Sequence, residues 1–496
     1  MYENAVGYMK ECATKYMRPI VTRKYDSSWD MFDYHTYPGG AWRIHMLRKR
    51  LGEEAFWSAV QTYIERFANK TVQTSDFQNC LEEASGFNLT RFFDEWVYGK
   101  GYPKLKGQYE YTSNRVKITL TQTQVDEAAQ VPLFGFELDV EVVTKAGKKV
   151  KTVVSFNQHD TVTAIVDLPE NDKPSQVCVD PEGKVLFTLD IPSVDRDILI
   201  ETAKSSESIV NRIWAYGELI SEGSRPALKA VKGLLKEEPY HGVRVEAAGK
   251  LAELNSVYSI EILSELLDNE QDPLAIAPIA SACTIVDGRL RSSLLRLLER
   301  EALPYRAHAA ALTALGAQRN PDDLEYLLSV AQDENKIGQH GIIRGGALKA
   351  LGMHRSEETF KYLLSRVGYN KEPMRSRGFA VQGLSNSAQW QNDVLKKQAI
   401  EELENLIRDP NQSVRVEAVE ALIELKVKSC CNSVEATRSM YSHDDHSWLD
   451  RKLRQLQDND TNDQQTAQKQ AIEKLQSRIK SLEDKLTLQE ALAKAK

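Results

Sequence analysis

The chain has 496 residues, of which 42% are hydrophobic and 27% are charged, the balance of an ordinary globular protein. This length predicts about three domains, because a single hydrophobic core seldom serves so long a chain. A net charge of −7 argues against a broad electrostatic hold on nucleic acid or on an anionic membrane, so neither partner is expected. No run of about 18 apolar residues is present. Six scattered cysteines without a C-x-x-C pair favour a reducing, cytoplasmic compartment.

The first 104 residues are predicted to be helical. Residues 41–51 follow a Pro-Gly-Gly turn and place apolar and basic side chains at helical spacing. Ser75 is the expected N-terminal cap of a later helix, with Gln78 completing a capping box. The string Gly101-Tyr102-Pro103 then breaks the chain direction. The other helices are expected over 53–67, 77–85 and 89–97.

Residues 105–192 change from a helical period to a period of two, which is typical of strands. Val116, Ile118 and Leu120 alternate with polar residues, and a turn is expected over 145–148. The other alternating runs are Phe136, Leu138, Val140 and Val142, and Val162, Ala164 and Val166. Short alternating strands separated by turns predict a small β-sandwich.

Residues 193–456 return to a helical pattern that repeats. The signature Arg-x-x-Ala-x-x-x-Leu begins at Arg212, Arg244, Arg344, Arg377 and Arg415, and His308 begins a variant of it. One degenerate copy near Ile276 would fill the longest gap. Helical units of this length must stack to bury their apolar faces. The region resembles HEAT-type α-solenoids. Residues 457–496 are predicted to be a polar linker followed by an amphipathic helix with about three heptads, which would either self-associate as a short coiled coil or stay single.

Residues 37–56, YPGGAWRIHMLRKRLGEEAF, resemble the segment of M1-family zinc aminopeptidases in which a tyrosine and a Gly-Ala pair open a helix. The Thr-Ser-Asp-Phe turn from Thr74, the Phe-Phe-Asp-Glu-Trp string from Phe92 and Gly101-Tyr102-Pro103 follow in the family's order. The resemblance implies a multidomain, mainly α fold. In it, residues 1–104 are the helical end of a thermolysin-like catalytic domain, 105–192 a β-sandwich, 193–456 the solenoid and 457–496 the terminal helix.

The resemblance also implies a role for Tyr37. In the family, a tyrosine at this position stabilises the tetrahedral oxyanion beside a zinc ion held by HExxH and a later glutamate. Here Pro38-Gly39-Gly40 replaces the family's Glu-Lys-Gly, and none of the nine histidines forms HExxH. Zinc is therefore the cofactor of the parent family, whereas no metal is expected on this chain. The family's third zinc ligand would lie further upstream of Tyr37 than Met1.

His443 and His446 form the only close histidine pair, spaced so that both imidazoles could face one side of a helix. Adventitious surface histidines are the expected interpretation, because a metal site needs more ligands than this segment offers. Two functions then compete. The first is a piece of an M1 aminopeptidase acting on peptides, inactive alone, with a separately encoded zinc-binding lobe. The second is a non-enzymatic repeat scaffold that binds protein partners.

Overall fold

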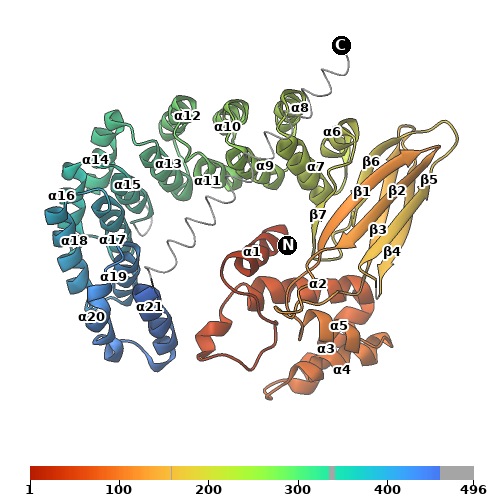
Figure 1. Cartoon of the computed structure of the whole chain (residues 1–496), viewed down its shortest axis with the longest axis horizontal. Helices are drawn as coiled ribbons and strands as arrows, with labels where there is room; N and C mark the ends of the chain where they lie inside the picture. The colour runs from red at the N-terminus through yellow and green to blue at the C-terminus, as the bar shows by residue number, and fades with distance from the viewer. Residues whose placement is uncertain (158, 335–340, 459–496) are drawn as a thin grey trace, which may run out of the picture. The chain divides into compact units, whose positions relative to one another are not determined.

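The structure is a computed structural model that describes residues 1–157, 159–334 and 341–458. It separates into two compact units, Met1–Ala302 and Leu303–Lys496. The mainly helical, multidomain character expected from the sequence is confirmed, with two small sheets among many helices (Figure 1). None of the described helices is long and apolar enough to cross a membrane. The predicted heptads of the terminal helix lie outside the described residues.

The N-terminal helices of the first unit enclose a core rich in aromatic side chains. Tyr8, Phe93 and Trp96 are buried in it, together with Phe134 from the loop before the third strand. One turn of π-helix, η2 (His35–Gly39), runs directly into the second helix. The helices are α1 (Tyr2–Thr14), α2 (Gly40–Leu51), α3 (Glu53–Phe67), α4 (Thr74–Ser85) and α5 (Thr90–Trp96), with a short 3-10 turn η1 (Ser28–Met31).

The expected cap at Ser75 is wrong by two residues. Helix α4 has Gln73 at its N-cap, and the capping box joins Gln73 to Asp76. The Asp76 carboxylate accepts the backbone N–H of Gln73 at 2.7 Å, which satisfies a donor that the helix itself cannot use. The negative charge of Asp76 in the first turn of the helix stabilises this start more than the Ser75 hydroxyl would stabilise a start two residues later.

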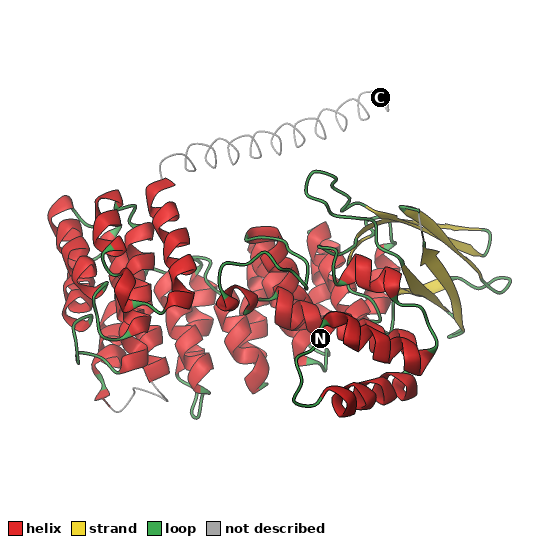
Figure 2. Cartoon of the chain, turned by 90° about the horizontal axis from the view of Figure 1, so that it is seen from below, coloured by secondary structure: helices red, strands yellow, loops and turns green. Residues whose placement is uncertain are grey.

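Two small sheets follow the helices, and their strands gather at one place in the unit (Figure 2). One sheet has the order β5-β2-β1-β7 and the other the order β4-β3-β6. The alternation predicted for Val116, Ile118 and Leu120 is confirmed, because all three are fully buried in β2. The strands are β1 (Lys104–Thr112), β2 (Arg115–Gln122), β3 (Phe136–Thr144), β4 (Lys149–Phe156), β5 (Thr161–Asp167), β6 (Pro174–Val179) and β7 (Thr188–Asp190).

The rest of the first unit is helical. Helix α7 packs on α6, α8 and α9, and α9 packs on α10 and α11, so neighbours in sequence are neighbours in space. These helices are α6 (Arg196–Ser205), α7 (Ile209–Glu222), α8 (Arg225–Leu235), α9 (His241–Leu254), α10 (Val257–Asn269), α11 (Pro273–Ala282) and α12 (Gly288–Leu298).

The second unit is a double row of helices. In Figure 1, α14, α16 and α18 form one row beside α15, α17 and α19, and α13 packs on α15. Its helices are α13 (Tyr305–Ala317), α14 (Leu324–Gln332), α15 (Ile342–Met353), α16 (Glu357–Arg366), α17 (Met374–Ala388), α18 (Asp393–Leu406), α19 (Gln412–Glu424), α20 (Cys431–Glu435) and α21 (His446–Asp458). The short 3-10 turns are η3 (Pro321–Asp323), η6 (Lys428–Cys430), η7 (Arg438–Met440) and η8 (His443–Asp445).

The repeated arginine has a structural explanation in these helices. Arg244 pairs with Glu270 at 2.7 Å, and Arg212 pairs with Glu238 at 3.1 Å; each glutamate lies beyond the helix that follows. Arg377 pairs in the same way with the buried carboxylate of Asp409. Each arginine therefore ties the start of its helix to the next turn of the chain. The helical units are observed, whereas their assignment to the HEAT type stays a prediction.

Candidate functional site

Tyr37 lies in the π-helical turn η2, immediately before α2. Its backbone N–H donates to the carbonyl of Asp33 at 3.2 Å. Its side chain is 57% exposed, and its ring rests at a tilt against Phe32, with the centroids 5.6 Å apart. No described residue forms a hydrogen bond with the phenol. The O–H group is therefore free to donate to a molecule outside the chain.

Close packing explains the glycine two positions after Tyr37. Gly39 is buried, and a Cβ placed there would come within 3.0 Å of side-chain atoms of both Ile20 and Tyr8. Real Cβ atoms are rarely found so close to a neighbour. A larger residue at position 39 would therefore push the side chains of Ile20 and Tyr8 away from the turn. The Pro-Gly-Gly string, which departs from the family's pattern, thus fits the local packing of this chain.

A buried polar network holds the turn from beneath. Glu11 on α1 accepts the Tyr34 N–H at 2.8 Å and contacts His35 Nδ1 at 3.2 Å. Asp33 receives two hydrogen bonds from the Arg18 guanidinium, at 2.9 and 2.6 Å. The Arg18 guanidinium also donates to the backbone carbonyls of Pro19 and Ile20. No sequence spacing predicted this network, because Glu11 and His35 are 24 residues apart.

The carboxyl and imidazole atoms of Glu11, Asp33 and His35 lie within 4.8 Å of one another, so the trio is a formal candidate for a metal. The hydrogen bonds that these three side chains already make do not fit a metal site. The backbone N–H of Arg18 donates to His35 Nε2 at 3.4 Å, which leaves Nδ1 as the protonated nitrogen toward the carboxylates. The Arg18 cation already occupies Asp33 and would repel a metal ion. The trio is therefore a hydrogen-bonded support for the turn and not a zinc site.

The ionisation of this network follows from burial and from the arginine. Burial works to raise the pKa of Asp33, but hydrogen bonds from Arg18, Thr36 and Tyr16 outweigh it and lower that pKa. Burial is also the main cause that lowers the pKa of His35, with the Arg18 charge acting the same way, although Asp33 and Glu11 oppose it. Asp33 is thus ionised and His35 neutral at pH 7.

A second support is the buried Arg43 on α2, whose side chain is 3% exposed. Its guanidinium donates to the carbonyls of Gly39, Trp96 and Gly101 at 3.3, 3.1 and 3.0 Å, and to the Tyr8 hydroxyl at 2.9 Å. It also lies 4.6 Å from the centre of the Tyr8 ring. One side chain therefore joins α1, the turn that carries Tyr37, α5 and the loop before β1.

The predicted histidine pair does not gather further ligands among the described residues. His443 is in a 3-10 turn and His446 begins α21, with their rings 5.5 Å apart. His446 Nε2 is 3.1 Å from the carbonyl of Arg438 and so donates to it. Asp445 accepts hydrogen bonds from Ser442 and Gln412 at 2.7 and 3.1 Å. These partners favour the interpretation of surface histidines.

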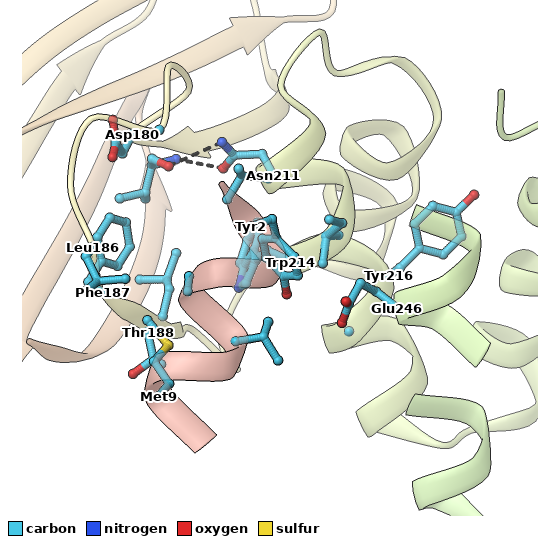
Figure 3. Close-up of a pocket in the computed structure, with 18 of the residues that line it drawn as sticks. Tyr2, Met9, Asp180, Leu186, Phe187, Thr188, Asn211, Trp214, Tyr216 and Glu246 are labelled. Atoms are coloured by element: carbon cyan, nitrogen blue, oxygen red, sulfur yellow. Dashed lines mark hydrogen bonds between the residues drawn. The ribbon is translucent and has the colours of Figure 1, made fainter. Parts of the chain in front are cut away.

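The first unit also contains a cavity of about 390 Å³ that the sequence analysis did not predict (Figure 3). Its walls come from α1, α2, α7, α9 and the segment from the end of β6 into β7. Trp42 and Trp214 contribute to it, and Glu246 reaches it from α9. Tyr37 is not among its lining residues. The sequence feature that could have indicated this cavity is the apolar face of α1, where Ala5, Val6 and Met9 lie at helical spacing.

Comparison with known proteins connects residues 1–96 to a family. These residues match the peptidase family M1 domain. Glutamyl aminopeptidase of Bitis rhinoceros is 27% identical over 150 residues, which are 29% of this chain and 16% of that enzyme. Aminopeptidase M1-A of Oryza sativa subsp. japonica is 38% identical over 74 residues, which are 15% of this chain and 8% of that enzyme.

The chain thus aligns with less than a fifth of the length of either relative. Among solved structures, Legionella pneumophila aminopeptidase A in complex with aspartic acid covers 89% of this chain with a TM-score of 0.49 and 12% identity, and 59% of that structure is covered in return. The resemblance first seen in the segment around Tyr37 is confirmed by the family match. Residues 1–96 are therefore M1 aminopeptidase-like.

Proposed function

We propose that this chain takes part in M1-type aminopeptidase chemistry, the removal of N-terminal residues from peptides, and that Tyr37 is its oxyanion donor. The supporting observation is the Tyr37 phenol itself, exposed and without a partner among the described residues, on a turn fixed by two buried networks. A neutral O–H held in place stabilises negative charge that develops only in the transition state. Such a donor contributes to turnover only when its position is fixed in advance.

We propose further that the chain does not turn over peptides by itself. The sequence has no HExxH, and the Glu11, Asp33 and His35 trio is already committed to internal hydrogen bonds. The metal and the general base would therefore have to come from outside residues 1–496, from a zinc-binding lobe that would face Tyr37. The scaffold alternative gains no support from the two relatives described above, both of which are named aminopeptidases.

The first experiment assays the purified chain with aminoacyl p-nitroanilides in the presence of zinc. We expect no release of nitroaniline above the rate of the buffer. A zinc-dependent rate that disappears in Tyr37→Phe would contradict the proposal that the chain is inactive alone. The same result would support Tyr37 as the oxyanion donor. The experiment therefore distinguishes the inactivity of the isolated chain from the role of Tyr37.

The second experiment grafts residues 1–96 into a complete M1 aminopeptidase in place of the matching segment. We expect the chimera to bind zinc and to hydrolyse the substrate. Tyr37→Phe should then lower kcat by about 100-fold or more, the usual cost of removing one oxyanion donor. Tyr34→Phe is the matched control, because Tyr34 is also exposed and only three residues away. Equal effects of the two substitutions would refute the role of Tyr37.

A further inference from the structure

The cavity beside α1 has the size and the walls of a small-molecule site. Its volume of about 390 Å³ is within the range of ligand pockets, about 300–1,000 Å³. Figure 3 shows Tyr2 and Met9 of α1, Trp214 of α7 and Glu246 of α9 around it. Phe187 adds a further aromatic ring from the segment before β7. All these elements belong to the first unit.

The two indole groups of the wall have their polar atoms satisfied. Trp42 donates its ring N–H to the carbonyl of Met1 at 2.9 Å. Trp214 donates to the carboxylate of Glu218 at 3.0 Å. What remains for a ligand is the faces of the rings, which carry the negative side of the aromatic quadrupole. Such faces attract apolar groups and cations, and they do not attract anions.

The carboxylate of Glu246 adds a negative charge to this wall. Among the described residues, no hydrogen-bond donor reaches it, although its side chain is half-buried. Burial raises the pKa of Glu246; Lys250 opposes this shift, and the negative charges of Glu3 and Glu253 add to it. Lys250 also lines the cavity, but it is exposed and forms its ion pair with Glu253 at 2.8 Å. A cation placed at Glu246 would therefore lie beside several negative charges and would stabilise the ionised form of this carboxylate.

We propose that this cavity binds an apolar organic cation, an arylalkylamine or a molecule of that kind, with its ammonium at Glu246 and its apolar body against Trp42 and Trp214. The proposal goes beyond the peptidase function and does not depend on it, because Tyr37 lies outside the cavity. A ligand here would contact α1 on the face opposite to Glu11, so it would also hold the helix that supports the tyrosine turn.

The test uses the full chain and isothermal titration calorimetry with 2-phenylethylamine. The comparison compounds are 2-phenylethanol, which lacks the charge, and 3-phenylpropionate, which carries the opposite charge. We expect the amine to bind at least tenfold more tightly than either one. Glu246→Gln should reduce amine affinity at least tenfold, whereas Glu237→Gln, an exposed glutamate outside the cavity, should leave it unchanged. Equal affinity for the amine and the alcohol, or no effect of Glu246→Gln, would overturn the proposal.

A second pair of variants tests the place of binding without touching a charge. Gly217 lines the cavity, and a Cβ added there would meet no atom within 4 Å, so Gly217→Leu would grow into the open space. Gly249 on α9 also has no atom within 4 Å of an added Cβ, but it does not line the cavity. We expect Gly217→Leu to abolish amine binding and Gly249→Leu to preserve it, with thermal melts showing that both fold. Retained binding in Gly217→Leu would overturn the proposed location.

Discussion

Replacing Arg43 by methionine tests whether one buried cation holds the tyrosine turn to the rest of the N-terminal helices. Methionine keeps much of the length and the apolar contacts of the side chain while it removes four hydrogen bonds. The Tyr8 hydroxyl keeps an acceptor, because it also donates to Gly101 at 3.1 Å. Within the described part of the chain, no other donor reaches the carbonyl of Trp96, so this carbonyl would be left buried and unpaired.

The magnitude follows from these contacts. Four hydrogen bonds at about 1 kcal/mol net each give about 4 kcal/mol. Part of this loss is offset because the variant no longer has to bury a cation that pairs with no carboxylate of the described residues. We therefore expect the free energy of unfolding of the first unit to fall by about 2–4 kcal/mol. For a domain of this size, each kcal/mol lowers Tm by about 2–4 °C, so the transition should shift by roughly 5–15 °C.

Differential scanning calorimetry measures this shift, and hydrogen exchange of residues 35–43 reports whether the turn itself loosens. Arg50→Met is the matched control, because Arg50 is on the same helix, exposed, and without a hydrogen bond among the described residues. Its effect should stay within about 0.5 kcal/mol. If the two variants melt at the same temperature, or if exchange near Tyr37 is unchanged in Arg43→Met, the reasoning is wrong.

Three further predictions concern the folded state. The fold lowers the pKa of His35 and so favours the neutral imidazole. The stability that this contributes is full above the unfolded pKa of about 6.5 and is lost as the pH falls from there through the folded pKa. The drop in Tm from pH 7 to pH 5 should therefore be smaller in His35→Gln than in the unmodified chain. Arg377→Met leaves the Asp409 carboxylate buried and should cost about 3–5 kcal/mol in urea unfolding, most of which the double variant with Asp409→Asn should restore. Gly383→Ala places a Cβ 2.6 Å from a backbone oxygen of α15 and should lower the free energy of unfolding by about 1–3 kcal/mol. Gly378→Ala, in which the atom nearest to the new Cβ is 3.4 Å away, should raise it by about 0.5–1 kcal/mol. The melting temperatures of the two variants, compared with that of the unmodified chain, test both expectations.

The succession of a helical, a strand-rich and a second helical region could be predicted from local patterns alone. The helix predicted over 41–51 is observed as α2 over 40–51, and the strands around Val116 and Phe136 and the helices after 193 also followed from periods of 3.6 and 2. The place of Tyr37 before α2 was also predicted, because the resemblance depended on residues adjacent in sequence. The Ser75 cap failed at the scale of a single turn, where the Asp76 carboxylate competes with hydroxyl caps.

What the amino-acid sequence determined by itself was the resemblance of its N-terminal segment to the M1 family, the lack of HExxH within residues 1–496 and the alternation of helical and strand regions. Each of these depends on neighbours along the chain. Only the tertiary structure decided that Glu11, Asp33 and His35, together with Arg18, form a hydrogen-bonded support and not a metal site. It alone also placed Trp42, Trp214 and Glu246 around one cavity. Such groups are separated by tens to hundreds of residues, and their meeting depends on how helices pack, which no local period encodes.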